Sequence, residues 1–407
     1  MAYGFINMQN KEPINEVRVV LDIVRWIIRA KQYPRISWGE LERINWPLLI
    51  QLVNYHEIAP FAYSYFNLFS QVAQDKSRDF LKSQYYFVLL QNSLFQDEFL
   101  RLVDIFRAEK IALVPIKGLA LLPDVYTRQS ARNMVDMDAL VREEELEKAE
   151  FLLIKSGYSK YLGSGSQAYW RNNNCNIPFK KEKGGWLFEL HFALDIKRSK
   201  GAVLPKLWDR LKPMDCNGRQ IKILSPEDTL FSLALHQRRF GRRLCLKNTL
   251  DTALLLKKYQ NDFDWDYVLG QAQAGKMRSA IFFTLLQAVL FLDTQIPKTV
   301  WKRLGISFWK KGLMLRIIKK HTFSVKSSKK AKYLYLKCHF LLYDSLWLPI
   351  RHLLCITPEE FAKFYNLPLY APKTQKLYKA RFFYGPYKMF IRASLDKIRQ
   401  NKSRQVV

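Results

Sequence analysis

The feature that most constrains the fold is a change in the hydrophobic period near residue 111. Before it, apolar residues recur every three or four positions, as in NEVRVVLDIVRWIIRA and FLKSQYYFVLLQNSLFQDEFLRLVDIFRAEK, which predicts amphipathic helices. After it come short apolar runs closed by glycine, of which IALVPIKG is the first, and these predict strands and turns. From SPEDTLFSLALHQRRF onward the pattern is helical again. We therefore expect an α+β protein in which one small α/β unit is inserted into helices.

Residues that start and stop elements refine this division. The stretch SWGELERINWPLLIQLVNYHEI predicts a helix that begins at Ser37, because Glu40 completes a capping box. Residues 176–180 and 186–192 predict two strands of a hairpin joined by the turn Gly184–Gly185. Four regions follow from these patterns: an N-terminal helical region at 1–110, an α/β core at 111–200, a helical domain at 201–325, and a basic, aromatic-rich C-terminal region at 326–407.

Two acids interrupt an apolar run in NMVDMDALV, which otherwise predicts a strand. Alternate residues of a strand share a face, so Asp136 and Asp138 point the same way, while Val135, Met137 and Ala139 form the opposite, buried face. Two carboxylates this close repel each other and raise one pKa unless a cation lies between them. Mg²⁺ is the natural cation for carboxylate oxygens that must also leave room for phosphate.

A third acid has the same local pattern in WLFELHF, where Glu189 lies between Phe188 and Leu190. If this strand lies beside the aspartate strand, three carboxylates converge and can hold two Mg²⁺ ions about 4 Å apart. His191 shares the face of Glu189, either as a group close to the metals or as a core histidine with its own hydrogen bonds.

Candidate phosphate ligands precede and follow these acids. Gly118 lies at a predicted strand-to-helix turn, where backbone amides can bind phosphate, and Lys117 adds a positive charge. Arg128 and Arg132 could bind further phosphate charge or form structural ion pairs. His236 lies on a predicted helix with a basic end. Either this helix packs in the core, or it forms one wall of the active-site cleft, where its arginines could meet the triphosphate or an acidic acceptor. The arginines of that end are Arg238, Arg239, Arg242 and Arg243.

The order of these motifs resembles the uncharacterised nucleotidyltransferase family, within the superfamily built on the DNA polymerase β-like palm. The resemblance rests on IKGLALLPDVYTRQSARNMVDMDALV, then AEFLLIKSGY, FELHFAL and LSPEDTLFSLALH, over about residues 15 to 260. It implies a palm formed by a small mixed sheet with flanking helices. It also implies metal-dependent transfer of a nucleoside monophosphate from an NTP, with Asp136, Asp138 and Glu189 as metal ligands and Gly118 at the triphosphate. In this chain Leu119 follows Gly118, where the superfamily usually has Ser or Gly.

The formal net charge of +30 predicts an anionic partner. Residues 301–407 carry 24 Lys and Arg but only four Asp and Glu, so most of the surplus lies there. The tail from Lys376 to Arg404 interleaves basic and aromatic residues, which favours an anionic membrane surface over nucleic acid, because no RNA-binding motif is present. A solvated basic surface is the simpler alternative. The five cysteines form no CxxC pair, and we expect a cytoplasmic protein that could attach to the inner face of the membrane.

Three functions remain open at this point. The first is a two-metal nucleotidyltransferase acting on an unknown acceptor, which could be a small molecule, a glycan or a protein. The second is a catalytically weak protein of the same fold that docks on a membrane or on nucleic acid. The third is a glycosyltransferase using D-x-D, which would need a Rossmann-like half before the motif, where residues 1–110 predict helices instead.

Overall fold

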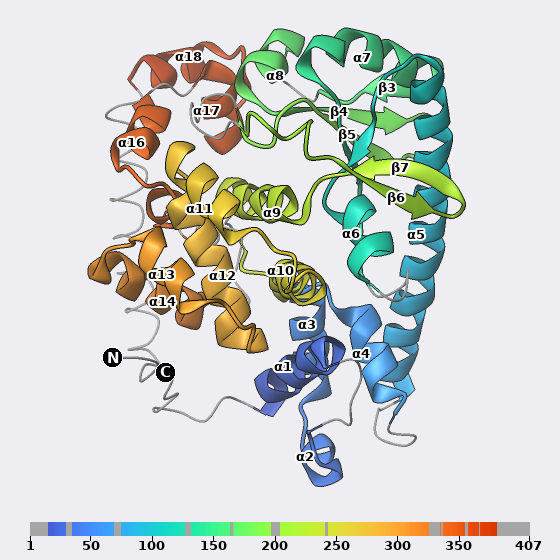
Figure 1. Ribbon diagram of the computed structural model, residues 1–407, viewed down its shortest axis with the longest axis vertical. Helices are drawn as coiled ribbons and strands as arrows, with labels where there is room; N and C mark the ends of the chain where they lie inside the picture. The colour runs from blue at the N-terminus through green and yellow to red at the C-terminus, as the bar shows by residue number, and fades with distance from the viewer. Residues whose placement is uncertain are drawn as a thin grey trace.

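The structure is a computed structural model (Figure 1). It describes residues 15–29, 35–68, 75–126, 132–162, 166–196, 204–240, 243–324, 334, 337–354, 357–365 and 367–380. Arg128, Arg242 and most of the basic tail, from residue 381, lie outside the described residues.

A five-stranded mixed sheet lies at the centre of the predicted α/β unit, with the strand order β1-β2-β5-β4-β3. Only β2 and β5 are parallel, and the other three neighbouring pairs are antiparallel. The predicted hairpin is confirmed as β4 and β5, with both turn glycines at positive φ. The strands are β1 (Val114–Pro115), β2 (Met137–Leu140), β3 (Tyr158–Lys160), β4 (Asn176–Lys181) and β5 (Leu187–His191).

The described residues among the first hundred are mainly helical, as predicted. Their helices are α1 (Asn15–Ile28), α2 (Trp38–Glu42), α3 (Trp46–Tyr55), α4 (Ala59–Phe66) and α5 (Asp75–Ala108). The single helix expected from Ser37 is wrong, because it is two helices. The capping box of Ser37 and Glu40 is present, but Asn45 starts α3 by accepting the Leu48 N–H at 3.1 Å, and Pro47 favours a new helix start there.

Helices also surround the sheet and make up most of the described chain after residue 225. Around the sheet are α6 (Gly118–Val125), the 3-10 turn η2 (Glu143–Glu145), α7 (Leu146–Lys155) and α8 (Gln167–Asn173). After it come α9 (Pro226–Phe240), α10 (Leu246–Lys258), α11 (Trp265–Ala274), α12 (Arg278–Leu292), α13 (Lys298–Leu304), α14 (Phe308–His321), α16 (Trp347–Leu354), α17 (Pro358–Tyr365) and α18 (Pro372–Lys379). Figure 1 shows α5 running along one side, from the N-terminal helices to the sheet.

A second hairpin interrupts the region expected to be only helical. It comprises β6 (Lys212–Cys216) and β7 (Arg219–Ile223), which pair antiparallel. Asn217 and Gly218 form its turn, both with positive φ. Asn-Gly is the preferred pair for such a two-residue turn, so the sequence does contain a signal for this hairpin.

One hydrophobic cluster joins the regions, because its buried members extend from Val17 to Leu342 and include residues of the sheet and of both sets of helices. The division into four regions therefore stays a prediction. Helix α12 is buried along nearly its whole length. None of the helices within the described ranges is long and apolar enough to cross a membrane. The four described cysteines are buried and not in disulfides.

Candidate active site

Two of the predicted acids lie side by side on the parallel strands. The register of β2 and β5 pairs Asp138 with Glu189, which confirms that the hairpin strand lies beside the aspartate strand. Asp138 is 4% exposed, and Glu189 is partly buried. Burial of two carboxylates at adjacent positions is costly unless positive groups compensate for them.

Asp136 approaches the same place from outside the strand. The expected strand from residue 134 is wrong at its start, because β2 begins at Met137 and Asp136 lies in the bend before it. Val135, expected on the buried face, is 62% exposed, whereas Met137 and Ala139 are buried as predicted. Burial, followed by the charges of Asp138 and Glu189, raises the pKa of Asp136 to about 7.

His191 is buried beside two of these acids. Its Nε2 lies 3.0 Å from Asp138 Oδ1 and 3.3 Å from Glu189 Oε2. Burial and the charge of Lys117 oppose its protonation, but hydrogen bonds to Asp138, Cys175 and Glu189 outweigh them and raise the pKa of His191 to about 10. The donor atoms of Asp138, Glu189 and His191 all lie within 4.8 Å of one another, a set that could hold a metal ion.

Lys117 supplies positive charge directly to the acids. Its Nζ lies 2.5 Å from Asp138 Oδ1 and 3.6 Å from Glu189 Oε2, and its side chain is 11% exposed. Burial opposes ionisation of Asp138, but Lys117 and His191 hold the pKa of that carboxyl well below its usual value. The backbone of Lys117, with φ 51° and ψ −123°, is in a region that non-glycine residues rarely occupy. Such strain is typical of functional sites, where surrounding contacts maintain it.

Close packing favours glycine at position 118 of this turn. A Cβ at this position would lie 2.5 Å from Arg132 Nη1 and 2.6 Å from Met134 Sδ. The turn therefore rests directly on the Arg132 guanidinium and on the chain that leads into Asp136. Its predicted contact with triphosphate stays a prediction.

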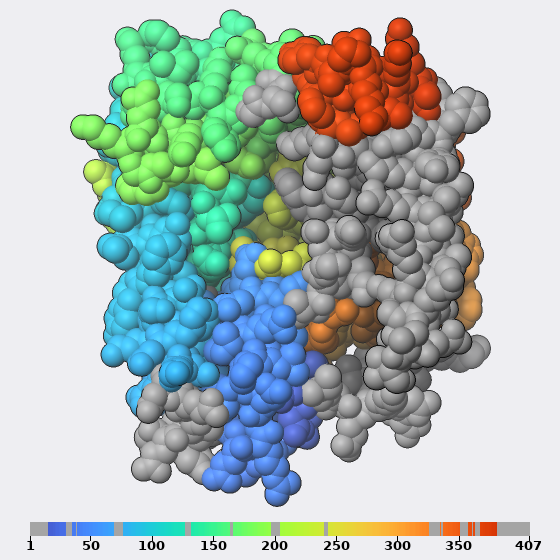
Figure 2. Space-filling view, turned by 180° about the vertical axis from the view of Figure 1, so that it is seen from behind, coloured from blue at the N-terminus to red at the C-terminus, as the bar shows by residue number. Residues whose placement is uncertain are grey.

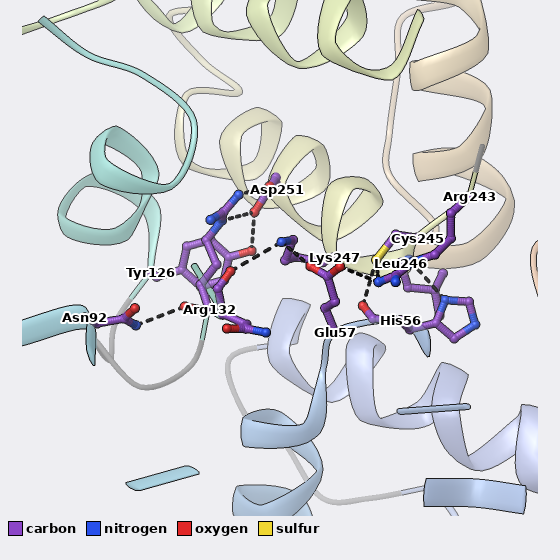
Figure 3. A network of polar contacts seen from close by, with 11 residues as sticks. His56, Glu57, Asn92, Tyr126, Arg132, Arg243, Cys245, Leu246, Lys247 and Asp251 are labelled. Carbon is purple, nitrogen blue, oxygen red and sulfur yellow. Dashed lines mark hydrogen bonds and ion pairs between the residues drawn. The ribbon is translucent and has the colours of Figure 1, made fainter. Parts of the chain in front are cut away.

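Arg132 belongs to a network of polar contacts that reaches α5 and α10 (Figure 3). Its Nε and Nη2 each donate to Asp251 of α10 at 2.8 Å, and the Tyr126 hydroxyl donates to the same carboxylate at 2.6 Å. Asn92 of α5 donates to the Arg132 carbonyl at 2.9 Å. Arg132 thus has a structural partner that the sequence did not identify, and its predicted contact with phosphate stays a prediction.

The other end of the network ties the N-terminal helices to α10. Glu57, which has a positive φ, accepts from Arg243 and Lys247. Its neighbour His56 accepts the Leu246 N–H at 3.2 Å through Nδ1. The first turn of α10 is therefore held by a loop nearly 190 residues earlier in the chain.

The acids, the turn and this network surround a cavity of about 380 Å³. On the face shown in Figure 2, yellow atoms near residue 250 are visible in a recess between the blue N-terminal helices and the green sheet region. His236 also lines the cavity, and burial followed by the charges of Lys117 and Arg239 lowers its pKa well below the ordinary value, so it is neutral. The lining residues are Glu57, Lys117, Gly118, Arg132, Met134, Val135, Asp136, Asp138, Glu189, Leu233, His236, Arg243, Cys245, Lys247, Asn248 and Asp251.

The predicted basic wall is therefore present only in part. Arg243 lines the cavity, whereas Arg238 pairs with Asp195 and Arg239 contacts the Cys175 thiol. Lys247, which sequence reasoning missed, lines the cavity instead.

A protein-family model described as an uncharacterised nucleotidyltransferase matches residues 42–293. The chain belongs to this uncharacterised nucleotidyltransferase family. The matched segment contains every residue that lines the cavity, from Glu57 to Asp251. The mixed α+β fold with its small sheet is consistent with a nucleotidyltransferase, and membership supports a general nucleotidyltransferase activity. None of the curated proteins matches the chain.

Proposed function

We propose that this nucleotidyltransferase is metal-dependent and transfers a nucleoside monophosphate from an NTP to an acceptor, releasing pyrophosphate. The observation that carries the proposal is the register of β2 and β5, which places Asp138 beside Glu189 on the cavity wall. We assign the sheet and its flanking helices to the catalytic palm, inserted between the N-terminal helices and the later helical domain.

The donor set fits a hard divalent cation. Carboxylate oxygens are the ligands that Mg²⁺ prefers, and the Lys117 ammonium already lies between two of these acids. When all three acids are ionised, they carry one more charge than Lys117 and protonated His191 neutralise, and the charges of Asp138 and Glu189 help to raise the pKa of Asp136. We propose that Asp136, Asp138 and Glu189 hold two Mg²⁺ ions. When bound, such ions stabilise the charge that develops during in-line phosphoryl transfer.

The chain's own groups then divide the remaining work. An oxygen of the acceptor forms a bond to the α-phosphorus of the NTP, the bond to the β-phosphate oxygen breaks, and pyrophosphate leaves. One of the three acids accepts the acceptor's proton at a carboxylate oxygen, as a general base. Lys117 and Gly118, with Arg128 and Arg132, are the proposed contacts of the triphosphate.

The decisive experiment compares two matched double variants. Each α-labelled NTP is incubated with the protein and Mg²⁺, and label transfer and pyrophosphate release are measured. Both should disappear in Asp136→Asn/Asp138→Asn and persist in Asp262→Asn/Asp266→Asn, which removes two carboxylates from exposed positions around the start of α11. Failure of the native protein to bind any Mg²⁺–NTP in calorimetry would refute the proposal.

The alternative is a catalytically weak binding protein of the same fold. The observations that favour it are the ion pairs of Lys117 with the acids and the Leu119 that follows Gly118. In that case Mg²⁺–NTP binds in calorimetry but neither label transfer nor pyrophosphate appears with any acceptor mixture. For either function we propose a cytoplasmic protein whose basic C-terminal region meets an anionic membrane surface rather than nucleic acid. The acceptor would be a small molecule, a glycan or a protein.

A further inference from the structure

Two neighbouring segments beyond the family-matched region expose large apolar side chains. At the start of α14, Phe308 is 82% exposed, and Trp309 and Leu313 are also exposed. Just before and within α16, Trp347 is 61% exposed and is accompanied by two further exposed aliphatic residues. Isolated exposed apolar residues need no explanation, but a group of them marks an interaction surface. We call the group the aromatic edge; its members are Phe308, Trp309, Leu313, Leu346, Trp347 and Ile350.

The two parts of the aromatic edge are tied to the same place in the fold. The buried Lys310 Nζ donates to the Tyr343 carbonyl at 2.6 Å and to Ser279 Oγ at 2.7 Å. Asp344 accepts the backbone N–H groups of Arg278 and Ser279 at the start of α12. Both exposed segments therefore flank the N-terminal end of α12, and an ordered scaffold fixes their spacing.

The same part of the chain has no negative charge over a long span. Between Asp293 and Asp344 there is no Asp or Glu, whereas there are 13 Lys and Arg. Arg316, Lys319 and Lys320 are exposed on α14, after the apolar residues at its start. Exposed apolar side chains bordered by cations are complementary to a lipid surface, where anionic headgroups lie above the hydrocarbon chains.

We propose that the aromatic edge, with the cations of α14, docks this protein on an anionic lipid bilayer. Tryptophan favours the boundary between lipid headgroups and hydrocarbon, and Leu313, Leu346 and Ile350 can enter the acyl region of a bilayer. A nucleic acid has a charged backbone and provides no comparable apolar region for these aliphatic side chains. The positive residues add attraction that depends on anionic lipid and falls with salt. The α16 part of this surface lies within the C-terminal region proposed above to meet the membrane, whereas the α14 part lies before that region. The whole surface is separate from the tail after residue 380 and goes beyond the proposed catalytic function.

A matched control exists on α5, where Phe87 and Leu90 are 58% and 62% exposed. Helix α5 has equal numbers of acidic and basic residues, so it offers apolar exposure without a charge surplus. The comparison is therefore Phe308→Ser/Leu313→Ser against Phe87→Ser/Leu90→Ser in the full chain. Circular dichroism and thermal melts check that both variants remain folded.

The test is co-sedimentation with vesicles of phosphatidylcholine containing phosphatidylglycerol, and with vesicles of phosphatidylcholine alone. We expect the native chain and the α5 variant to bind the anionic vesicles. The α14 apolar variant and Arg316→Gln/Lys319→Gln/Lys320→Gln should each bind about tenfold more weakly or worse. Equal binding of the native chain to both vesicle types, or an α14 apolar variant that binds like the α5 variant, would overturn the proposal. Salt-dependent binding of RNA in a mobility-shift assay, with no vesicle binding, would assign the surface to nucleic acid instead.

Discussion

Replacing Asp251 with Asn should lower the free energy of unfolding by about 3–5 kcal/mol, because it leaves the buried Arg132 guanidinium without its counter-charge. Arg132 is 6% exposed and Asp251 is fully buried, so water solvates the remaining charge only poorly. The substitution preserves shape, and the loss is therefore electrostatic rather than a packing defect.

The contacts of Asp251 set this magnitude. Its carboxylate accepts two hydrogen bonds of 2.8 Å from Arg132 and one of 2.6 Å from Tyr126. An Asn side chain keeps one oxygen but turns an NH₂ group toward a guanidinium donor, so at least one charge-assisted bond worth about 1.5–3 kcal/mol is lost. That loss is part of the total cost of about 3–5 kcal/mol for leaving a buried charge unpaired. Because the free energy of unfolding of a domain is only about 5–15 kcal/mol, this variant should fold but should unfold at a much lower urea concentration than the native chain.

The assay is urea unfolding followed by circular dichroism, with Asp266→Asn as the control. Asp266 forms an exposed ion pair with Arg303, and loss of such a pair costs less than about 1 kcal/mol. A second variant, Arg132→Met/Asp251→Leu, removes both charges and should recover most of the lost stability. If Asp251→Asn costs no more than Asp266→Asn, the buried pair does not hold α10 against the turn at Gly118.

Three further predictions follow from the same contacts. Gly118→Ala should lower the free energy of unfolding, measured with urea, by about 1–3 kcal/mol, because the new Cβ would lie 2.5 Å from Arg132 Nη1. The control Gly270→Ala has open space around the new Cβ inside α11 and should be neutral or stabilising. Equal effects of the two substitutions would contradict the close packing at Gly118. Lys117→Met should lower the melting temperature measured in EDTA, and adding Mn²⁺ should restore part of the lost melting temperature, because the ion replaces the missing positive charge beside the acids. If Mn²⁺ leaves the melting temperature of the variant unchanged, the result counts against the metal site. Burial, followed by the charge of Arg243, lowers the pKa of His56 to about 3, so the folded protein keeps this histidine neutral. The stability that neutral His56 contributes is fully present above pH 6.5 and decreases as the pH falls toward 3, because the histidine of the unfolded chain binds a proton in that range. Between pH 6.5 and 5 the native chain should lose about 2 kcal/mol more than His56→Gln in urea unfolding, and parallel losses would refute the assignment.

Much of the fold was predictable because it depends on neighbours in the sequence. The alternation in Trp186–Phe192 and the glycine pair before it identify β5 and its turn, since period and turn chemistry are local properties. The same kind of local signal, at Asn217 and Gly218, marks the turn of the second hairpin. Helix α3 is separate from α2 because Asn45 caps it, again a local feature.

The acids were predictable for a similar reason, but their exact arrangement was not. An acid within an apolar run stands out, so the sequence alone is enough to select Asp136, Asp138 and Glu189. Strict alternation failed at Asp136, because β2 starts only at Met137 and the residues before it bend into the cavity. The pairing of Asp138 with Glu189 depends on strand register, which a local pattern does not specify.

The compensating groups are harder to find than the acids, and the reason is physical. From the sequence alone, a lysine or arginine on an amphipathic helix cannot be distinguished from a solvent-exposed residue, because its partner is set by tertiary contacts. Lys247 and Asp251 lie on one turn of α10, yet Lys247 pairs with Glu57 and Asp251 pairs with Arg132, both more than a hundred residues away. Lys117 lies 21 residues before Asp138, and the direction of its side chain depends on a backbone conformation that is rare for lysine. The sequence therefore indicates where negative charge must be balanced, whereas the groups that balance it are determined by tertiary contacts between the sheet, α10 and the N-terminal helices.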